Sequence, residues 1–520
     1  MPAHGQSSAQ SCSTQRSSQT ILWPAVREPF SLDLRSLAVF RIGLAFVLIW
    51  DLSNRFTDLG AHYTDDGVLP RSALSEVWPL SVHVLGGSAA FETIPFLVAG
   101  LFAGLLLVGY RTGLATFVSW FMLLSVQARN PIILQGGDVL LRLLLFWGIF
   151  LPLGERWSVD VARRKSGVQS SDRTVSLATA AFILQLCFVY WFGAALKSHP
   201  IWRSEGTAVY YALSIEQLAT PLGKYLLGFP ALLKNLTFGT LALEVFGPTL
   251  LFVPFFRGPI RFFVVVTFIL FHVAGLGLCL QLGPFPYVCA VAWLALLPGW
   301  FWEQQWLVRT GQWLEQRSTA NRPAASGARL DGRPTVVTAS AMMNTLAGFF
   351  LVYVLLWNVR SLDFERYSKY FPRKANFVAD LFRVDQWWNM FAPFPLREDG
   401  WYVIEGELKD GAHVDIFNDG QPVRWQKPEL VSATYPNERW RKYLMNLAHS
   451  DYQRYRVHYL EYLRREWDKE HPGARQLRKV NMYFMLKPTL PDYQSVPPER
   501  LLLCECSYPS CEAVSAGECP

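Results

Sequence analysis

The feature that most constrains this chain is a series of nine apolar stretches, each near the length of a bilayer-spanning helix. A helix needs roughly 17 to 25 mostly apolar residues to cross the hydrocarbon core of a bilayer. The stretches are Leu37–Leu52, Phe91–Gly109, Leu114–Ala128, Val139–Leu153, Val175–Leu196, Leu232–Phe256, Ile260–Leu282, Tyr287–Trp302 and Ala341–Val359. Only 17% of the residues are charged, against about 25% in soluble domains. We therefore expect a mainly α fold, a polytopic transmembrane helix bundle of about nine spans in contact with the lipid bilayer.

The beginning of the chain, residues 1–30, contains no apolar core and is rich in Ser and Gln up to about Gln19. A signal peptide would require a basic start followed by an apolar stretch, so we expect a disordered cytoplasmic tail instead. Lys and Arg concentrate in the loops around residues 155–167 and 303–333, which fall on the side of this tail if the spans alternate. The protein is therefore expected to have a cytoplasmic N-terminus, with everything after Val359 on the exported side.

Residues 360–520 differ in composition from the predicted transmembrane domain over residues 31–359. This part is polar, and DGWYVIEGEL, AHVDIF and KVNMYFMLKP read as strands separated by turn signals. An amphipathic helical pattern runs through RWRKYLMNLAHSDYQRYRVHYLEYLRREW. We expect an extramembrane α+β domain. Its end contains Cys504, Cys506, Cys511 and Cys519, for which disulfides or simple thiols are favoured over a metal site because paired histidines are missing nearby.

Several ionisable residues lie inside the apolar stretches, where burying a charge is expensive and usually has a reason. Asp138 and Arg142 are four positions apart, so they share one helix face and can pair. Arg142, like Arg41 and Asp51, is interpreted first as a structural group. Glu244 and His272 lie deeper in their stretches, so for them a buried functional site is as good an interpretation as a structural pair.

One lysine stands where a long apolar run ends, in FGAALKSHPIW (residues 192–202). Lys197 can be an interfacial anchor or a reactive amine. An amine at an apolar boundary loses hydration, which disfavours its charged form and suits a general base. The loops AHYTDDGVLPR, ARNPIILQGGD and ALKSHPIWRSEG share the predicted exported side and mix glycine, amides, hydroxyls and charge. This pattern is typical of loops that converge over a cavity.

Four segments in order along the chain resemble one known family. They are FRIGLAFVLIWDLSNRFTDLGAHYTDDGVLPR, RNPIILQGGDVLLRLLLFWGIFLPLGERWSVD, FGAALKSHPIWRSEGTAVYYAL and VDQWWNMFAPFPLREDGWYVIEGEL. Together with the spans that contain Glu244 and His272, they are similar to the HTTM (horizontally transferred transmembrane) family, which is related to vitamin K-dependent γ-glutamyl carboxylases. The resemblance covers roughly Leu32 to Gly420.

This resemblance implies a reaction class. The carboxylases oxidise vitamin K hydroquinone with oxygen, and the strong base formed removes a proton from the γ-carbon of a peptide glutamate, which then captures carbon dioxide. A lysine in a segment like AGxKKxxxxW deprotonates the hydroquinone, and counting back from Trp202 matches it to Lys197. The chain departs from the pattern at Leu196, which replaces the first lysine, and at Asp138, which stands about where the carboxylases have a histidine-containing loop.

Two hypotheses of different class follow. The first is a carboxylase-like membrane enzyme with Lys197, Asp138, His272 and Glu244 as candidate catalytic residues. Its cosubstrate would be vitamin K hydroquinone or another reduced quinone, and a protein or peptide would be its substrate at the exported face. The second is a non-catalytic membrane scaffold whose exported domain binds a partner or a lipid, with Lys197 snorkelling to the interface. A transporter ranks third, because no convincing internal repeat is found.

Other functional classes find no support in the sequence. P-loop, G-x-G-x-x-G, H-E-x-x-H and G-x-S-x-G motifs are missing, and no metal site is expected. The formal net charge of +7 is spread over the predicted cytoplasmic loops and the outer helix. Attraction to a membrane surface explains that charge better than nucleic acid binding does.

Overall fold

The computed structural model describes residues 27–74, 78–164, 170–307, 309, 335–337, 340–491, 494 and 496–508. Six helices in this part of the chain are long and apolar enough to cross a membrane. They are α2 (Leu34–Thr57), α4 (Ala89–Val108), α8 (Leu177–Leu196), α12 (Pro230–Thr249), α13 (Arg257–Leu270) with its π-helical continuation η6 (Phe271–Gly277), and α17 (Ala341–Leu362). The disordered tail predicted for residues 1–30 lies almost wholly outside the described residues.

The other three predicted spans correspond to helices that are shorter or more polar. α6 (Gly136–Gly148) and α14 (Phe285–Leu294) have 13 and 10 residues, too few to cross a bilayer, and both are largely buried by the surrounding helices. α5 (Thr112–Arg129) has the length of a span but includes several buried polar side chains. The predicted count of nine spans is therefore not confirmed, although all nine stretches are helical.

Short helices connect these elements and lead out of the bundle. They are α3 (Leu59–Tyr63), α7 (Val159–Ala162), α9 (Pro200–Arg203), α10 (Ala208–Leu213), α11 (Pro221–Leu226), α15 (Gly299–Trp302), α18 (Phe364–Tyr367) and α19 (Asn376–Phe382). A small sheet of β1 (Leu32–Asp33), β2 (Ser170–Thr174) and β3 (Thr335–Val337) joins segments that are distant in sequence. At the same end, the Arg257 side chain contacts Glu28, and Arg261 donates to the carbonyl of Ser31 at 3.0 Å.

The helix that carries the candidate lysine has clear start and stop signals. Ser176 caps the first turn of α8, and its hydroxyl and that of Thr179 satisfy each other's backbone N–H groups. The helix ends at Leu196, and Pro200 follows, a residue that cannot continue a helix because it lacks an N–H. Lys197 is therefore the residue at which the chain leaves the span.

The C-terminal part contains an antiparallel sheet in the order β5-β4-β6-β7. Its strands are β4 (Glu398–Leu408), β5 (His413–Asp415), β6 (Leu477–Pro488) and β7 (Glu499–Ser507), and the helices α20 (Glu438–Ala448) and α21 (Arg456–Glu470) lie between β5 and β6 in sequence. The three predicted strands are thus confirmed. The predicted helical segment is helical, but the 3-10 turns at Ser450–Tyr455 divide it into α20 and α21. Of the cysteine cluster, Cys506 is disulfide-bonded and Cys504 is a buried free thiol, whereas Cys511 and Cys519 lie outside the described residues.

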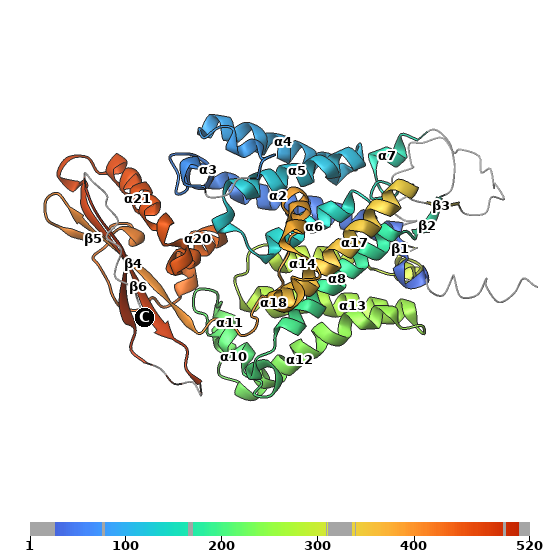
Figure 1. The fold of residues 1–520 in the computed structure, drawn as a ribbon. Helices are drawn as coiled ribbons and strands as arrows, with labels where there is room; N and C mark the ends of the chain where they lie inside the picture. The colour runs from blue at the N-terminus through green and yellow to red at the C-terminus, as the bar shows by residue number, and fades with distance from the viewer. Residues whose placement is uncertain are drawn as a thin grey trace, which may run out of the picture.

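The sheet and α21 form one end of the molecule, and β1, β2 and β3 lie at the opposite end (Figure 1). Between the sheet and the bundle runs α20, which packs against the loop that leads into α6 (Figure 1). The two parts of the chain are therefore in direct contact through this helix.

Candidate functional site

Lys197 is buried, although it stands at the end of an apolar helix. Its backbone N–H still bonds to the Gly193 carbonyl of α8 at 3.3 Å, while its carbonyl accepts from the Arg203 Nε at 3.0 Å. The side chain does not snorkel to an interface, because only 4% of the residue is exposed. The interpretation of Lys197 as an exposed interfacial anchor does not fit this position.

Glu244 is the partner of this lysine. It lies on α12, which packs against α8, and only 8% of the residue is exposed. The Lys197 Nζ donates to both carboxylate oxygens, at 3.0 Å to Oε1 and 2.8 Å to Oε2. The indole ring of Trp202 lies 5.2 Å from Nζ and adds a cation–π contact. Two of the four sequence-predicted candidates therefore form one buried ion pair.

The segment at residues 388–391 covers this pair. The Trp202 Nε1 donates to the Phe391 carbonyl at 2.9 Å. On the other side, a Cβ placed on Gly193 would lie 3.5 Å from the Trp388 carbonyl oxygen and 3.7 Å from the Lys197 Nζ. Gly193 thus leaves a gap of about one methyl group between the amine and the covering segment.

A cavity of about 890 Å³ lies where this segment, the bundle and α20 meet. Aromatic side chains line much of it, including those of Phe285, Trp357, Trp387, Trp388 and Phe391. Trp388 and Phe391 therefore contact the neighbourhood of the ion pair as well as the cavity. Lys197 and Glu244 do not themselves line the cavity.

His272, the third candidate, lies in the π-helix η6 and is buried among aromatic rings. Its Nδ1 is 2.7 Å from the Phe268 carbonyl oxygen, so Nδ1 must carry a proton, because a carbonyl oxygen only accepts. Its Nε2 is 3.4 Å from the Tyr190 hydroxyl, which also accepts from the Trp293 Nε1 at 2.7 Å. A neutral His272 therefore satisfies this network, and Nε2 is the acceptor for the Tyr190 proton.

This aromatic network adjoins both the ion pair and the cavity. The residue after Tyr190, Trp191, donates through Nε1 to the carbonyl of the residue after Glu244, at 3.2 Å. On the other side the rings of His272 and Phe285 are 5.9 Å apart, and Phe285 lines the cavity. Local π-helices are frequent at functional sites, which suits this location.

Asp138, the fourth candidate, belongs to a different group of charges. Its carboxylate contacts Arg55 of α2, and it accepts from Arg439 of α20 at 2.7 and 2.9 Å. Asp51 completes the group, with its two oxygens 2.7 Å from the Arg55 Nε and 2.5 Å from the Arg439 Nη2. Two carboxylates and two guanidinium groups are thus buried together, and Asp138 holds the C-terminal part to the bundle.

The pairing of Asp138 with Arg142 that their spacing allows does not form. Arg142 donates instead to the backbone and side-chain oxygens of Asp385, both at 2.7 Å. Arg55 and Arg439 already bind the Asp138 carboxylate. Arg142 binds Asp385 instead, in the segment that follows α19. The structural interpretation holds for Arg41, which is fully buried and donates to the carbonyls of Leu153 and Trp157 at 3.1 and 2.6 Å.

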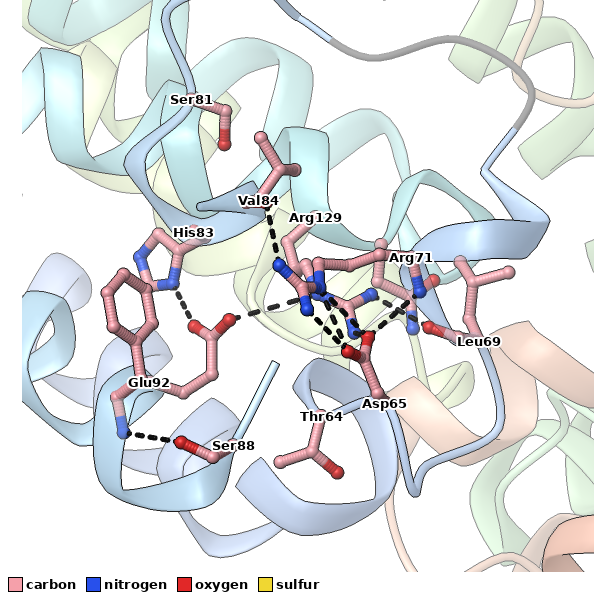
Figure 2. Close-up of polar contacts among 12 residues, drawn as sticks. Thr64, Asp65, Leu69, Arg71, Ser81, His83, Val84, Ser88, Glu92 and Arg129 are labelled. Carbon is pink, nitrogen blue, oxygen red and sulfur yellow. Dashed lines mark hydrogen bonds and ion pairs between the residues drawn. The ribbon is translucent and has the colours of Figure 1, made fainter. Parts of the chain in front are cut away.

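A second group of charges lies at the start of α4, where His83, Glu92 and Arg129 are buried and Asp65 and Arg71 are partly exposed (Figure 2). The His83 Nδ1 is 2.6 Å from Glu92, and the other oxygen of Glu92 is 3.8 Å from the Arg129 Nε. Arg129 reaches Asp65 at 3.6 Å, and Asp65 pairs with Arg71 at 2.7 Å. Asp65 of the loop AHYTDDGVLPR therefore fastens that loop to α5 through Arg129, which also reaches Glu92 of α4. Neither here nor elsewhere in the described residues are three or more His, Cys, Asp or Glu side chains arranged to hold a metal ion.

Sequence reasoning missed several residues of these networks. The spacing in the sequence could have indicated Arg55, since it follows Asp51 by four positions on one helix and can pair with it. Arg439 and Tyr190 had none, because Arg439 reads as part of a solvent-facing helix and Tyr190 as one aromatic residue among many in its span. Their partners lie 301 and 103 positions away along the chain.

The fold and these buried ion pairs define a polytopic membrane protein with charged and aromatic networks inside its helix bundle. A comparison with known families matches the HTTM domain over residues 31–306, more than half of the chain. The protein belongs to the HTTM family. No curated protein and no solved structure matches the chain.

Proposed function

We propose that this protein is an integral-membrane enzyme with carboxylase-like chemistry. Its site would be the Lys197–Glu244 pair, and its cosubstrate vitamin K hydroquinone or another reduced quinone. The observation that carries the proposal is the burial of a lysine and its glutamate partner at the end of a span, 2.8 Å apart. A buried ion pair offers little net stability over well-packed apolar side chains. Unlike the Asp51–Asp138 group, which joins the C-terminal part to the bundle, this pair lies beside the aromatic cavity, and that location favours a functional reason.

The pair is suited to taking a proton from a weakly acidic hydroxyl. A reduced quinone supplies such a hydroxyl on its ring. An ammonium group has three donors, and the Lys197 Nζ directs two N–H groups at Glu244. Lys197 would act as the base: as it passes one proton to Glu244, its amine takes the proton of the hydroxyl. The ammonium formed stays close to the oxygen that gains negative charge. The base and the stabilising cation would thus be provided together.

The surroundings fit a flat, lipid-soluble ring. The cavity behind residues 388–391 has aromatic walls and a volume of about 890 Å³, within the range of small-molecule sites. Because Lys197 does not line this cavity, a substrate there would reach Nζ only when the segment at residues 388–391 moves aside at Gly193, where the gap is about one methyl group wide. His272 and Tyr190 would act as positioning residues at the Phe285 side of the cavity, because they contact the wall and not the pair.

The test is turnover by the purified protein. The full chain is mixed with vitamin K hydroquinone, and separately with reduced ubiquinone and menaquinone, and oxygen uptake and quinone epoxide are measured. We expect turnover with at least one quinone and a loss of at least a hundredfold in kcat for Lys197→Ala. The matched control is Lys409→Ala, a lysine in the exposed turn between β4 and β5.

A charge swap separates a catalytic pair from a structural one. Lys197→Glu combined with Glu244→Lys retains an ion pair and should restore folding better than either single change, yet it moves the amine to α12 and should stay inactive. Wild-type protein that turns over no quinone, or a Lys197→Ala variant that equals the wild type, would overturn the proposal. Folding without turnover in every variant would leave the scaffold as the better explanation.

The membrane orientation and the second substrate belong to this proposal. We infer a cytoplasmic N-terminus and an exported C-terminal part, with a peptide glutamate as the carboxyl acceptor at the exported face. The inference is supported by the basic residues Arg257 and Arg261 at the end opposite the sheet. A phosphatase fused to the C-terminus should be active only if that end is exported, and an inactive fusion beside an active cytoplasmic reporter would reverse the orientation.

A further inference from the structure

The cavity between the bundle and α20 has an excess of positive charge. Four cationic side chains line it, those of Arg142, Arg360, Arg441 and Lys442, together with one carboxylate, Asp385. Arg142 and Asp385 form a salt bridge at 2.7 Å, so their two charges compensate each other. Three cations therefore face this space without an acidic counterpart in its lining.

These three cations have no carboxylate within 4.0 Å among the described residues. Arg441, 4% exposed, donates to the Gln281 side-chain oxygen at 3.1 Å, which is a neutral partner. Arg360, also 4% exposed, donates to the Phe371 carbonyl and stacks 4.4 Å from the Trp357 ring. Burial lowers the pKa of Arg441 to about 10 and lowers that of Lys442, because both cations lose hydration. Glu438 and Asp138 favour the charged forms of Arg441 and Lys442, respectively, but neither carboxylate lines the cavity. A buried cation without a close ion pair is costly, so this space suits an anion.

The other features of the cavity select an anion with an apolar body. Trp357, Trp387, Trp388 and Phe391 form apolar walls beside the cations. Arg360 stands at the end of the predicted span α17, where membrane helices meet the headgroups. Trp387 is 62% exposed at this level, as expected of an aromatic side chain at a lipid–water interface. This position suits a ligand that enters from the bilayer.

We propose that this cavity binds the phosphate headgroup of an anionic lipid. Arg441 and Lys442 of α20 and Arg360 of α17 would hold the phosphate, and the tryptophan-lined wall would hold the start of the acyl chains. Basic pockets between membrane helices bind anionic headgroups on the cytoplasmic side through charge of this kind. In the orientation proposed above, this pocket would face the exported leaflet. The lipid and the quinone of the proposed function would share this cavity, with Trp388 and Phe391 in the walls of both. The phosphate site does not include Lys197, so each proposal can fail without the other.

Binding by the full chain in a neutral detergent tests this proposal, with native mass spectrometry as the readout. The probes are dioleoyl phosphatidic acid, dioleoylglycerol, which has the same chains without phosphate, and inorganic phosphate. We expect phosphatidic acid to bind at least tenfold more tightly than either of the others. The double variant Arg441→Gln and Lys442→Gln should lose this preference, whereas Arg478→Gln on the sheet surface, 68% exposed, should keep it.

Three outcomes would overturn the assignment. Equal binding of phosphatidic acid and dioleoylglycerol would show that only apolar contact holds the lipid. Equal binding of inorganic phosphate and phosphatidic acid would show that the acyl chains contribute nothing to binding. An unchanged preference in the double variant would put the site elsewhere. Lys442→Gln alone, at a partly exposed position of α20, keeps the test valid if the double variant fails to fold. Lys197→Met should bind phosphatidic acid like the wild type, which separates this proposal from the enzymatic one.

Discussion

His62 of α3 is a buried histidine whose two ring nitrogens have no hydrogen-bond partner among the described residues. The ring packs 4.4 Å from that of Trp440 on α20. Burial strips hydration from the protonated ring, and the nearby Arg439 and Arg55 guanidinium groups repel it, so the pKa of His62 is lowered to about 3. The folded protein therefore holds this imidazole in its neutral form.

The lowered pKa predicts a loss of stability in acid. Since the pKa of an unfolded histidine is about 6.5, the unfolded chain binds more protons than the folded one between about pH 6.5 and 3. Above about pH 6.5 the protonation of His62 does not reduce the free energy of unfolding. That free energy decreases as the pH falls from about 6.5 to 3. At about pH 5 the loss is roughly 2 kcal/mol, and it approaches about 5 kcal/mol near pH 3.

His62→Phe should flatten this acid response, because phenylalanine keeps the ring and cannot take up a proton. We expect the thermal midpoint in detergent to fall less for the variant than for the wild type between about pH 7.5 and about pH 5. His413→Phe serves as the control, since this histidine on β5 is exposed. Equal acid losses in the His62 variant and the wild type would contradict the prediction.

At the scale of single residues, the sequence pointed to Lys197 and Glu244 but not to their pairing. They are 47 positions apart, and only the packing of α8 against α12 brings them together. The sequence also indicated that Asp138 is buried. It did not indicate that Arg439 is its partner, because Arg439 lies in a helix whose composition is that of a soluble domain.

At the scale of helices, two adjacent glycines at the start of α6 have different surroundings. A Cβ on Gly137 would lie 3.0 Å from the Phe285 Cα and 3.1 Å from its backbone N, so the backbone of α14 would have to move. A Cβ on Gly136 would meet only ring carbons of Phe285 at 3.7 Å, an ordinary contact. The crossing of α6 and α14 therefore needs a glycine at one of these positions and not at the other.

Gly137→Ala should destabilise the protein by roughly 1–3 kcal/mol through overpacking. Gly136→Ala should be neutral or stabilising by up to about 1 kcal/mol, because alanine is the better helix former. The thermal midpoints of the two variants, measured side by side, check this difference. A Gly137→Ala midpoint at or above that of Gly136→Ala would show that the two helices are not in close contact.

At this scale, the sequence predicted every long helix and three of the four strands of the C-terminal sheet. It overcounted the spans because hydropathy alone does not separate a membrane helix from a short helix enclosed by others, as α6 and α14 show. It missed β7, whose run ERLLLCECS does not alternate between apolar and polar residues at its start. Strand pairing with β6 determines that conformation, and no local pattern reports it.

At the scale of the whole molecule, the sequence predicted two parts of different composition, and the structure adds the contact that joins them. Arg439 of α20 reaches Asp51 of α2 and Asp138 of α6, 388 and 301 positions earlier in the chain. Both Asp residues are 1% exposed. The C-terminal part is therefore fastened to the bundle through charges that are inaccessible to water, and through the aromatic contact between His62 and Trp440.

Removing this arginine should loosen the contact between the two parts. In Arg439→Met, Asp51 and Asp138 would share only Arg55, and an uncompensated buried charge costs roughly 3–5 kcal/mol. We expect a lower thermal midpoint and faster proteolytic release of the C-terminal part. Arg478→Met, which removes an exposed arginine paired with Glu407 at 3.2 Å, should cost less than about 1 kcal/mol and leave proteolysis unchanged. Adding Asp138→Asn to Arg439→Met removes the excess negative charge and should recover part of the loss. Proteolysis of Arg439→Met at the wild-type rate would mean that apolar contacts alone hold α20 in place.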